Sequence, residues 1–148
     1  MKIYEAGLIR NDKLLIRRRY YKESSNPIEN ERQRLICMTF IDTMKRKAEY
    51  NNKLVSYELF KYHLSMIGRK NGSKSKFILY LVSNKKVGLD IKNAIIMELF
   101  DEFFNEYPAP SCYTVKKDSF NGFYDKIDKI IGDLSLKPEE RLYKAFGK

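Results

Sequence analysis

A short apolar run, Lys76–Val82, most constrains how this chain can fold. Apolar and polar residues do not alternate within it, and polar residues close it on both sides, at Ser73–Ser75 and at Ser83–Asn84. A buried helical segment is the competing interpretation, but the run is short and its polar flanks are close. We therefore interpret it as a strand that is covered on both faces, which places it in the interior of a sheet.

Turn signals and the spacing of apolar residues locate the other elements. Asn11–Asp12 and Asn71–Gly72 are hairpin signals, and Asn26–Pro27 combines a helix cap with a proline at the first helical position. Gly7, inside the first strand, indicates a bulge or a close approach of another group. We expect strands at residues 3–10, 13–21, 54–62, 64–70 and 76–82, and helices at residues 27–50, 90–106 and 118–133.

This element order, β-β-α-β-β-β-α-α, predicts an α+β fold with one five-stranded, mainly antiparallel sheet and helices packed on it. The strand at 13–21 is expected at an edge of the sheet with its Arg-rich half in solvent, because charge discourages the addition of another strand. The helix at 27–50 is expected to place one apolar arc on the sheet, formed by Cys37, Met38, Phe40, Ile41, Met44 and Ala48.

Length and composition limit the class of protein. A chain of 148 residues, 43% of them apolar, is long enough for one folded domain, which we place at residues 1–135 with a tail at 136–148 that could form a short helical turn. No apolar stretch approaches the roughly 18 residues of a membrane span, and the first residues do not resemble a signal peptide. Cys37 and Cys112 show neither metal nor disulfide spacing, so we expect reduced thiols and a cytoplasmic protein.

The charge is large and uneven. The net charge is +10, and residues 1–86 carry 20 basic and 8 acidic side chains against 9 and 11 in residues 87–148. Such asymmetry favours a basic surface that faces an anionic partner, although a merely Lys-rich surface would look the same. Alternation along a strand sends Arg18 to the opposite face from Arg17 and Arg19. The candidate anion- or partner-binding residues are Arg17, Arg18, Arg19, Arg69, Lys70, Lys74 and Lys76.

The sequence offers little for catalysis. The segment 68–75 lacks the Gly-Lys-Ser/Thr end of a phosphate-binding loop, so it is either an anion-binding loop or a solvated hairpin tip. His63 is the only histidine, and no nucleophile or orienting partner is recognisable near it in the sequence. The carboxylates of the helix at 90–106 have the spacing of a solvated face. We expect no enzymatic activity, no cofactor and no metal site.

The element order resembles the longin fold, which includes small and medium subunits of clathrin adaptors, longin SNAREs and transport-particle subunits. Ala6–Arg18 looks like the opening adaptor hairpin, with a glycine in strand one and a second strand that changes from apolar residues to arginines. Lys76–Asn84 followed by Ile95–Tyr107 is similar to the last strand and the next helix, and Val115–Asp133 resembles the final helix. The resemblance implies a longin or profilin-like sheet over residues 1–135.

Two functions from different classes follow. The resemblance implies a non-enzymatic scaffold that binds other proteins, such as a small GTPase or another longin-like subunit, in vesicle trafficking, as a homo- or heterodimer and with peripheral contact to membranes. The charge alone supports an alternative, a basic module that binds nucleic acid or an acidic membrane surface. The known base-stacking motifs are absent from the sequence, which makes nucleic acid the weaker of the two anionic partners.

Overall fold

A computed structural model describes residues 3–11, 13–20, 35, 38–39, 41–59, 62–71, 75–107, 120 and 122–135. Several expectations lie outside these residues: the helix start at Asn26–Pro27, both cysteines, Phe40, Lys74 and the tail at 136–148.

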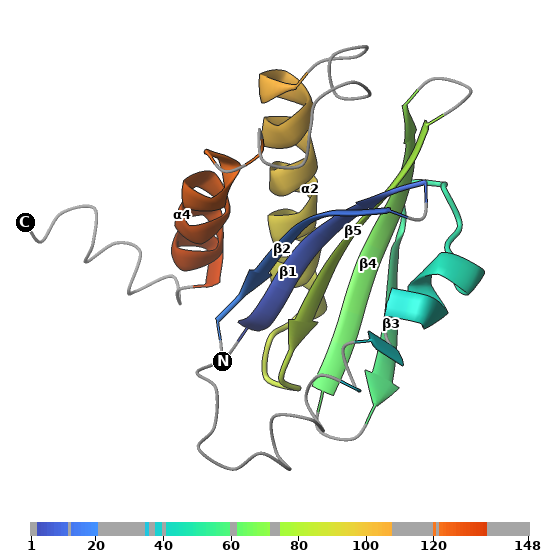
Figure 1. Ribbon diagram of the computed structural model, residues 1–148. Helices are drawn as coiled ribbons and strands as arrows, with labels where there is room; N and C mark the ends of the chain where they lie inside the picture. The colour runs from blue at the N-terminus through green and yellow to red at the C-terminus, as the bar shows by residue number, and fades with distance from the viewer. Residues whose placement is uncertain are drawn as a thin grey trace, which may run out of the picture.

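One antiparallel sheet of five strands organises the described part of the chain (Figure 1). The strands lie in the order β2-β1-β5-β4-β3, so β5 is central and β2 is at an edge, as predicted. The expected α+β class and the order β-β-α-β-β-β-α-α are confirmed. The elements are β1 Ile3–Arg10, β2 Lys13–Arg19, helical residues 41–47, β3 Leu54–Leu59, β4 Tyr62–Asn71, β5 Ser75–Ser83, α2 Leu89–Glu106 and α4 Phe123–Ser135.

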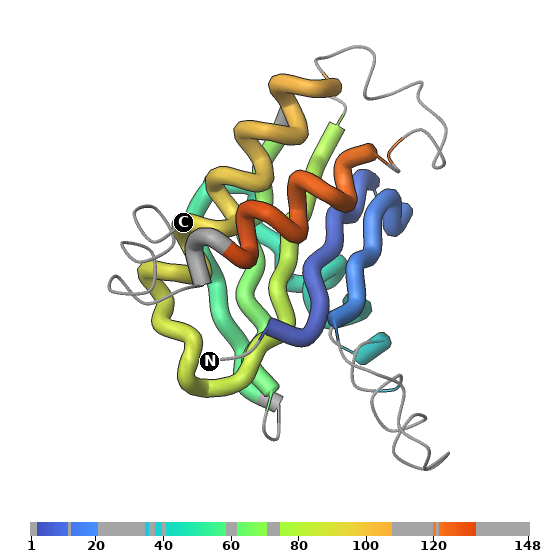
Figure 2. The backbone as a smooth tube through the Cα atoms, turned by 90° about the vertical axis from the view of Figure 1, so that its left-hand side faces the viewer, coloured from blue at the N-terminus to red at the C-terminus, as the bar shows by residue number. Residues whose placement is uncertain are grey.

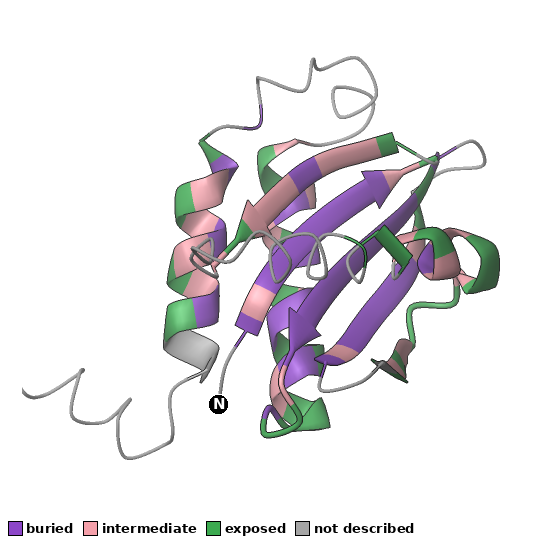
Figure 3. Cartoon of the chain, turned by 60° about the horizontal axis from the view of Figure 1, so that its bottom comes forward, coloured by how far each residue is buried: buried purple, intermediate pink, exposed green. Residues whose placement is uncertain are grey.

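The central strand is buried on both faces because its apolar residues occupy both parities. Phe77, Leu79 and Leu81 join the core under α2 and α4, which lie side by side over one face of the sheet (Figure 2). Ile78, Tyr80 and Val82 join a second cluster on the other face, which includes Met44 of the helical segment. Residues 77–83 are all buried, as the colours of Figure 3 show for the middle of the sheet.

Several predicted boundaries were wrong. β3 ends at Leu59 and β4 begins at Tyr62, and no glycine or proline in the sequence marks that division. The first helical segment ends at residue 47 rather than 50. Met38 does not lie on the buried arc, since its exposed fraction is 48% whereas Met44 is fully buried. Six residues of helix rotate the two side chains about 120° apart, so they cannot both face the sheet.

The first hairpin confirms two local expectations. Arg10 pairs with Lys13, and Asn11 adopts a positive φ of 44°, which asparagine tolerates in a tight turn. Gly7 lies directly opposite Tyr80, and any Cβ at Gly7 would collide with the tyrosine ring. Glycine is therefore required for this close approach. Among the described helices, none is long and apolar enough to cross a membrane.

Candidate partner-binding site

The seven candidate basic residues do not form one patch. Arg19 pairs with Glu5 of β1, which in turn pairs with Val82, near the end of β5. Lys70 pairs with Lys76, near the start of β5. Six residues of extended strand separate Lys76 from Val82, a distance of about 20 Å. The arginines of β2 and the basic residues of the β4–β5 hairpin therefore lie at opposite ends of the sheet.

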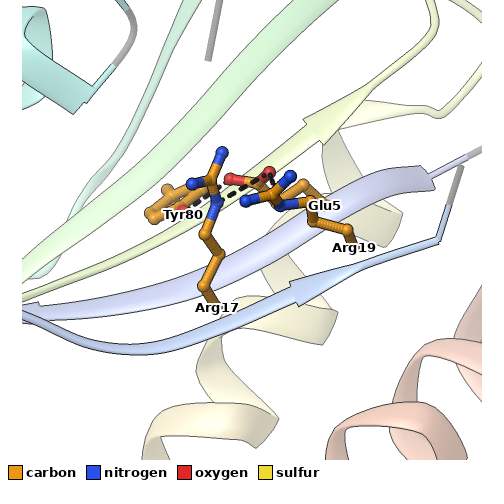
Figure 4. Close-up of polar contacts among 4 residues, drawn as sticks. All are labelled: Glu5, Arg17, Arg19 and Tyr80. Atoms are coloured by element: carbon orange, nitrogen blue, oxygen red, sulfur yellow. Dashed lines mark hydrogen bonds and ion pairs between the residues drawn. The ribbon is translucent and has the colours of Figure 1, made fainter. Parts of the chain in front are cut away.

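A buried carboxylate gathers two of the arginines. Glu5 is fully buried and accepts a 2.6 Å hydrogen bond from the Tyr80 hydroxyl and a 3.2 Å bond from Arg17 Nε. Arg19 Nε lies 4.0 Å from the same Glu5 oxygen. Figure 4 shows both arginines reaching from β2 over β1 towards Glu5 and Tyr80. Gly7 allows this arrangement, because only a residue without Cβ leaves room for the Tyr80 ring across the strand.

This cluster corrects the expectation that the arginines of β2 run into solvent. The exposed fraction of the Arg17 side chain is only 22%, and its guanidinium compensates a carboxylate that has no access to water. Such a charge-assisted bond is stronger than a bond between neutral groups. Arg19 is 45% exposed and only at the limit of ion-pair distance. Two cations around one anion leave the excess charge on Arg19, which can reach a partner.

Arg18 points to the other face of the sheet, as the alternation predicted. It donates two hydrogen bonds to Asp128 of α4, from Nε at 3.0 Å and from Nη2 at 2.7 Å. Tyr20 donates a third bond to Asp128, at 2.6 Å. Burial, followed by this bond to Asp128, raises the pKa of Tyr20 above its ordinary value, so the phenol keeps its proton and remains a donor. Together they fix the edge strand β2 to α4.

The β4–β5 hairpin divides its basic residues in the same way. Arg69 lies over the ring of Phe100, with 4.5 Å from its Cζ to the ring centre, and its Nη1 is 3.5 Å from Asp101 Oδ1. It is therefore packed against α2 rather than offered to a ligand. Lys70 and Lys76 are exposed, and both point to the opposite face from Arg69.

Sequence reasoning missed the acidic partners. Glu5 is the one charged residue among the apolar residues 3–9 of the first strand, which was a usable signal for a buried ion pair. Asp128 lies among residues with helical apolar spacing, and its contact with Arg18 spans 110 residues. No pattern in the sequence indicates that contact, because it depends on how α4 lies on the sheet.

His63 has more neighbours than the sequence indicated. Glu58 pairs with His63, and His63 pairs with Ser83, so a carboxylate, an imidazole and a hydroxyl lie in one row across three strands. However, His63 Nε2 is 3.8 Å from Glu58 Oε1, and an ion pair with Lys85 engages Glu58 and lowers its pKa. Ser83 Oγ is buried and makes no hydrogen bond to the described residues. The row thus lacks the bonded and accessible nucleophile that acyl transfer requires.

Other ligand classes find no support within the described part of the chain. It contains no group of three or more His, Cys, Asp or Glu side chains that could hold a metal ion. Comparisons of the chain with protein-family models and with curated protein sequences found no match. The functional argument therefore depends on the residues and geometry of this chain.

Proposed function

We propose that this protein is a non-enzymatic protein-interaction scaffold of the longin type, which binds a folded partner through the edge strand β2. The observation that carries the proposal is the state of this strand. Among the described strands it pairs with β1 alone, yet its side chains are held firmly on both faces of the sheet. A rigid strand with an open edge suits a partner that adds a strand of its own.

The backbone of β2 offers groups for that addition. The Tyr20 N–H donates to the Tyr4 carbonyl at 2.8 Å, so it points towards β1. Because successive residues of a strand point their backbone groups to opposite sides, the N–H and C=O of Arg19 point away from β1. An added strand would take hydrogen bonds from this side. A carboxylate on that strand could pair with the exposed guanidinium of Arg19.

The paired arginines lower the cost of binding. Arg17 is held by Glu5, and Arg18 is held by Asp128, so neither side chain has to be ordered when a partner arrives. Preorganisation of this kind saves conformational entropy at an interface. The same pairing speaks against nucleic acid as the partner, since Arg17, Arg18 and Arg69 already face carboxylates of this protein.

The resemblance to longin domains supplies the class of partner. We infer a small GTPase or another longin-like subunit, bound in the cytoplasm in an adaptor of vesicle trafficking, or a second copy of this chain. The scaffold needs no cofactor, and we expect the pure protein to turn over no hydrolase, nucleotidase or transferase substrate.

Cross-linking in native lysate followed by hydrogen exchange tests the proposal. Cross-linking identifies the partner, and exchange on the reconstituted complex should show slower exchange of the outward β2 amides, including that of Arg19. Arg19→Gln should weaken binding, whereas Lys13→Gln, an equal loss of charge at the other end of β2, should change it less. Protection confined to β3 or to the helix layer would contradict the edge-strand proposal. Robust turnover that a single polar substitution abolishes would contradict the non-enzymatic one.

A further inference from the structure

We propose that the end of the sheet that carries Lys13, Lys70 and Lys76, here called the basic sheet end, docks on an anionic lipid membrane. The proposal goes beyond the protein-binding function and does not depend on it, because it concerns the opposite end of the sheet from Arg19.

Two hairpins bring these lysines together. Arg10 pairs with Lys13 where β1 turns into β2, and Lys70 pairs with Lys76 where β4 turns into β5. Figure 1 shows both connections at the same end of the sheet. Asn11 joins them: its N–H donates to the Lys76 carbonyl at 3.0 Å, and its side-chain oxygen accepts from the Lys76 N–H at 2.9 Å. The lysines therefore stand on one fixed surface rather than on independent loops.

The pairing of Lys70 with Lys76 opposes two like charges. Directly opposite residues of an antiparallel pair point to the same face with Cβ atoms about 5 Å apart, and like charges there destabilise the sheet. Lys76 Nζ lies 5.3 Å from the centre of the Tyr50 ring, which helps to hold it in place. Lys13, Lys70 and Lys76 are all exposed, and none of them forms an ion pair with a described residue.

The contrast with the neighbouring arginine makes this unusual. Arg69 precedes Lys70 in the same strand and has both a carboxylate, Asp101, and an aromatic ring to receive it. The fold thus compensates cations on the face that α2 covers and leaves them uncompensated on the other. A local conflict that the rest of the fold tolerates is expected at a functional surface. Here an external anion would remove the repulsion.

A membrane fits this surface better than nucleic acid does. Unpaired strands of nucleic acid are held by stacking on open aromatic faces, but Lys76 lies over the Tyr50 ring. Membrane interfaces accept basic residues together with apolar side chains. Leu35 and Met38, 54% and 48% exposed, lie on the helical segment whose Met44 packs on the face towards which Lys70 and Lys76 point.

Vesicle flotation with the full chain tests the proposal. The protein should float with vesicles that contain phosphatidylserine and stay behind with vesicles of phosphatidylcholine alone, and salt should weaken the binding. Each lysine near an anionic surface contributes about a fivefold gain in affinity, so the double variant Lys70→Gln/Lys76→Gln should bind roughly 25-fold more weakly. The control Lys86→Gln/Lys129→Gln removes the same charge from exposed sites elsewhere and should bind like the wild type.

Thermal unfolding separates a binding role from a structural one. Because the Lys70 and Lys76 charges repel, their removal should leave the melting midpoint unchanged or raise it. Three results would overturn the proposal: equal flotation with both kinds of vesicle, equal weakening by the test and control variants, or tighter binding of a single-stranded or duplex RNA than of the anionic vesicles.

Discussion

The hydrogen bond between Tyr80 and Glu5 should be the most informative single contact in the protein. Tyr80→Phe removes the hydroxyl that donates to the buried Glu5 carboxylate at 2.6 Å and keeps the ring that lies over Gly7. The change therefore creates almost no cavity, and the loss is that of a hydrogen bond to a charged group, about 1.5–3 kcal/mol. Arg17 would remain as the partner of Glu5, which limits the loss to this range.

Urea unfolding measures this loss as a shift of the midpoint at constant slope, since the buried surface is unchanged. Tyr57→Phe is the matched control, because Tyr57 is an intermediate-exposure residue whose hydroxyl has no described hydrogen bond, and it should stay within about 0.5 kcal/mol of the wild type. A double-mutant cycle with Glu5→Gln should give a coupling energy of about 0.5–3 kcal/mol. A Tyr80→Phe protein as stable as the control, or a coupling near zero, would refute the charged bond to Glu5.

Three further predictions concern packing, the Arg18 contact and a buried lysine. Leu81→Ala in β5 should cost about 2–5 kcal/mol in urea unfolding, because Leu81 is fully buried; a cost under 1 kcal/mol would contradict tight packing. A cycle of Arg18→Gln with Asp128→Asn should show favourable coupling that remains at high salt, since the pair is bidentate and partly buried. Burial lowers the pKa of Lys92, which is 1% exposed and has no described ion pair, so its unfolded form holds the proton more readily. The stability of the wild type should then rise with pH between the lowered pKa and the ordinary 10.5, and the advantage of Lys92→Met at pH 7 should shrink towards pH 10.5; an advantage that does not change with pH would contradict the buried charge.

The architecture was predictable where one local signal settled it. Residues 77–82 are apolar on both parities, so no arrangement other than an interior strand hides them all. The division of β3 from β4 at residues 59–62 was not predictable to the residue, because the whole segment 54–70 carries strand-forming side chains without a glycine or proline before Gly68. Strand propensity locates such a segment and does not say where it turns.

The candidate site was predictable only as far as the period of a strand reaches. Alternation alone separated Arg18 from Arg17 and Arg19, and the contacts agree with it. The partners could not be found in this way, because Glu5 meets Arg19 through the register that the hairpin sets and meets Tyr80 through a strand 75 residues away. Alternation gives the face on which a charge lies, but tertiary pairing decides whether that charge is available for binding.

The two kinds of cation in this protein are used differently, and the difference follows from their chemistry. A guanidinium is planar, weakly hydrated and forks onto a carboxylate, which suits the partly buried pairs of Arg17 and Arg18. An ammonium is strongly hydrated and holds its water unless a charge replaces it, which suits exposed positions such as Lys70 and Lys76. Net charge therefore overstates what the arginines offer to an anionic partner and is a better guide to the lysines. If so, replacing the exposed lysines should change the salt dependence of membrane binding, and replacing Arg17 should mainly change stability.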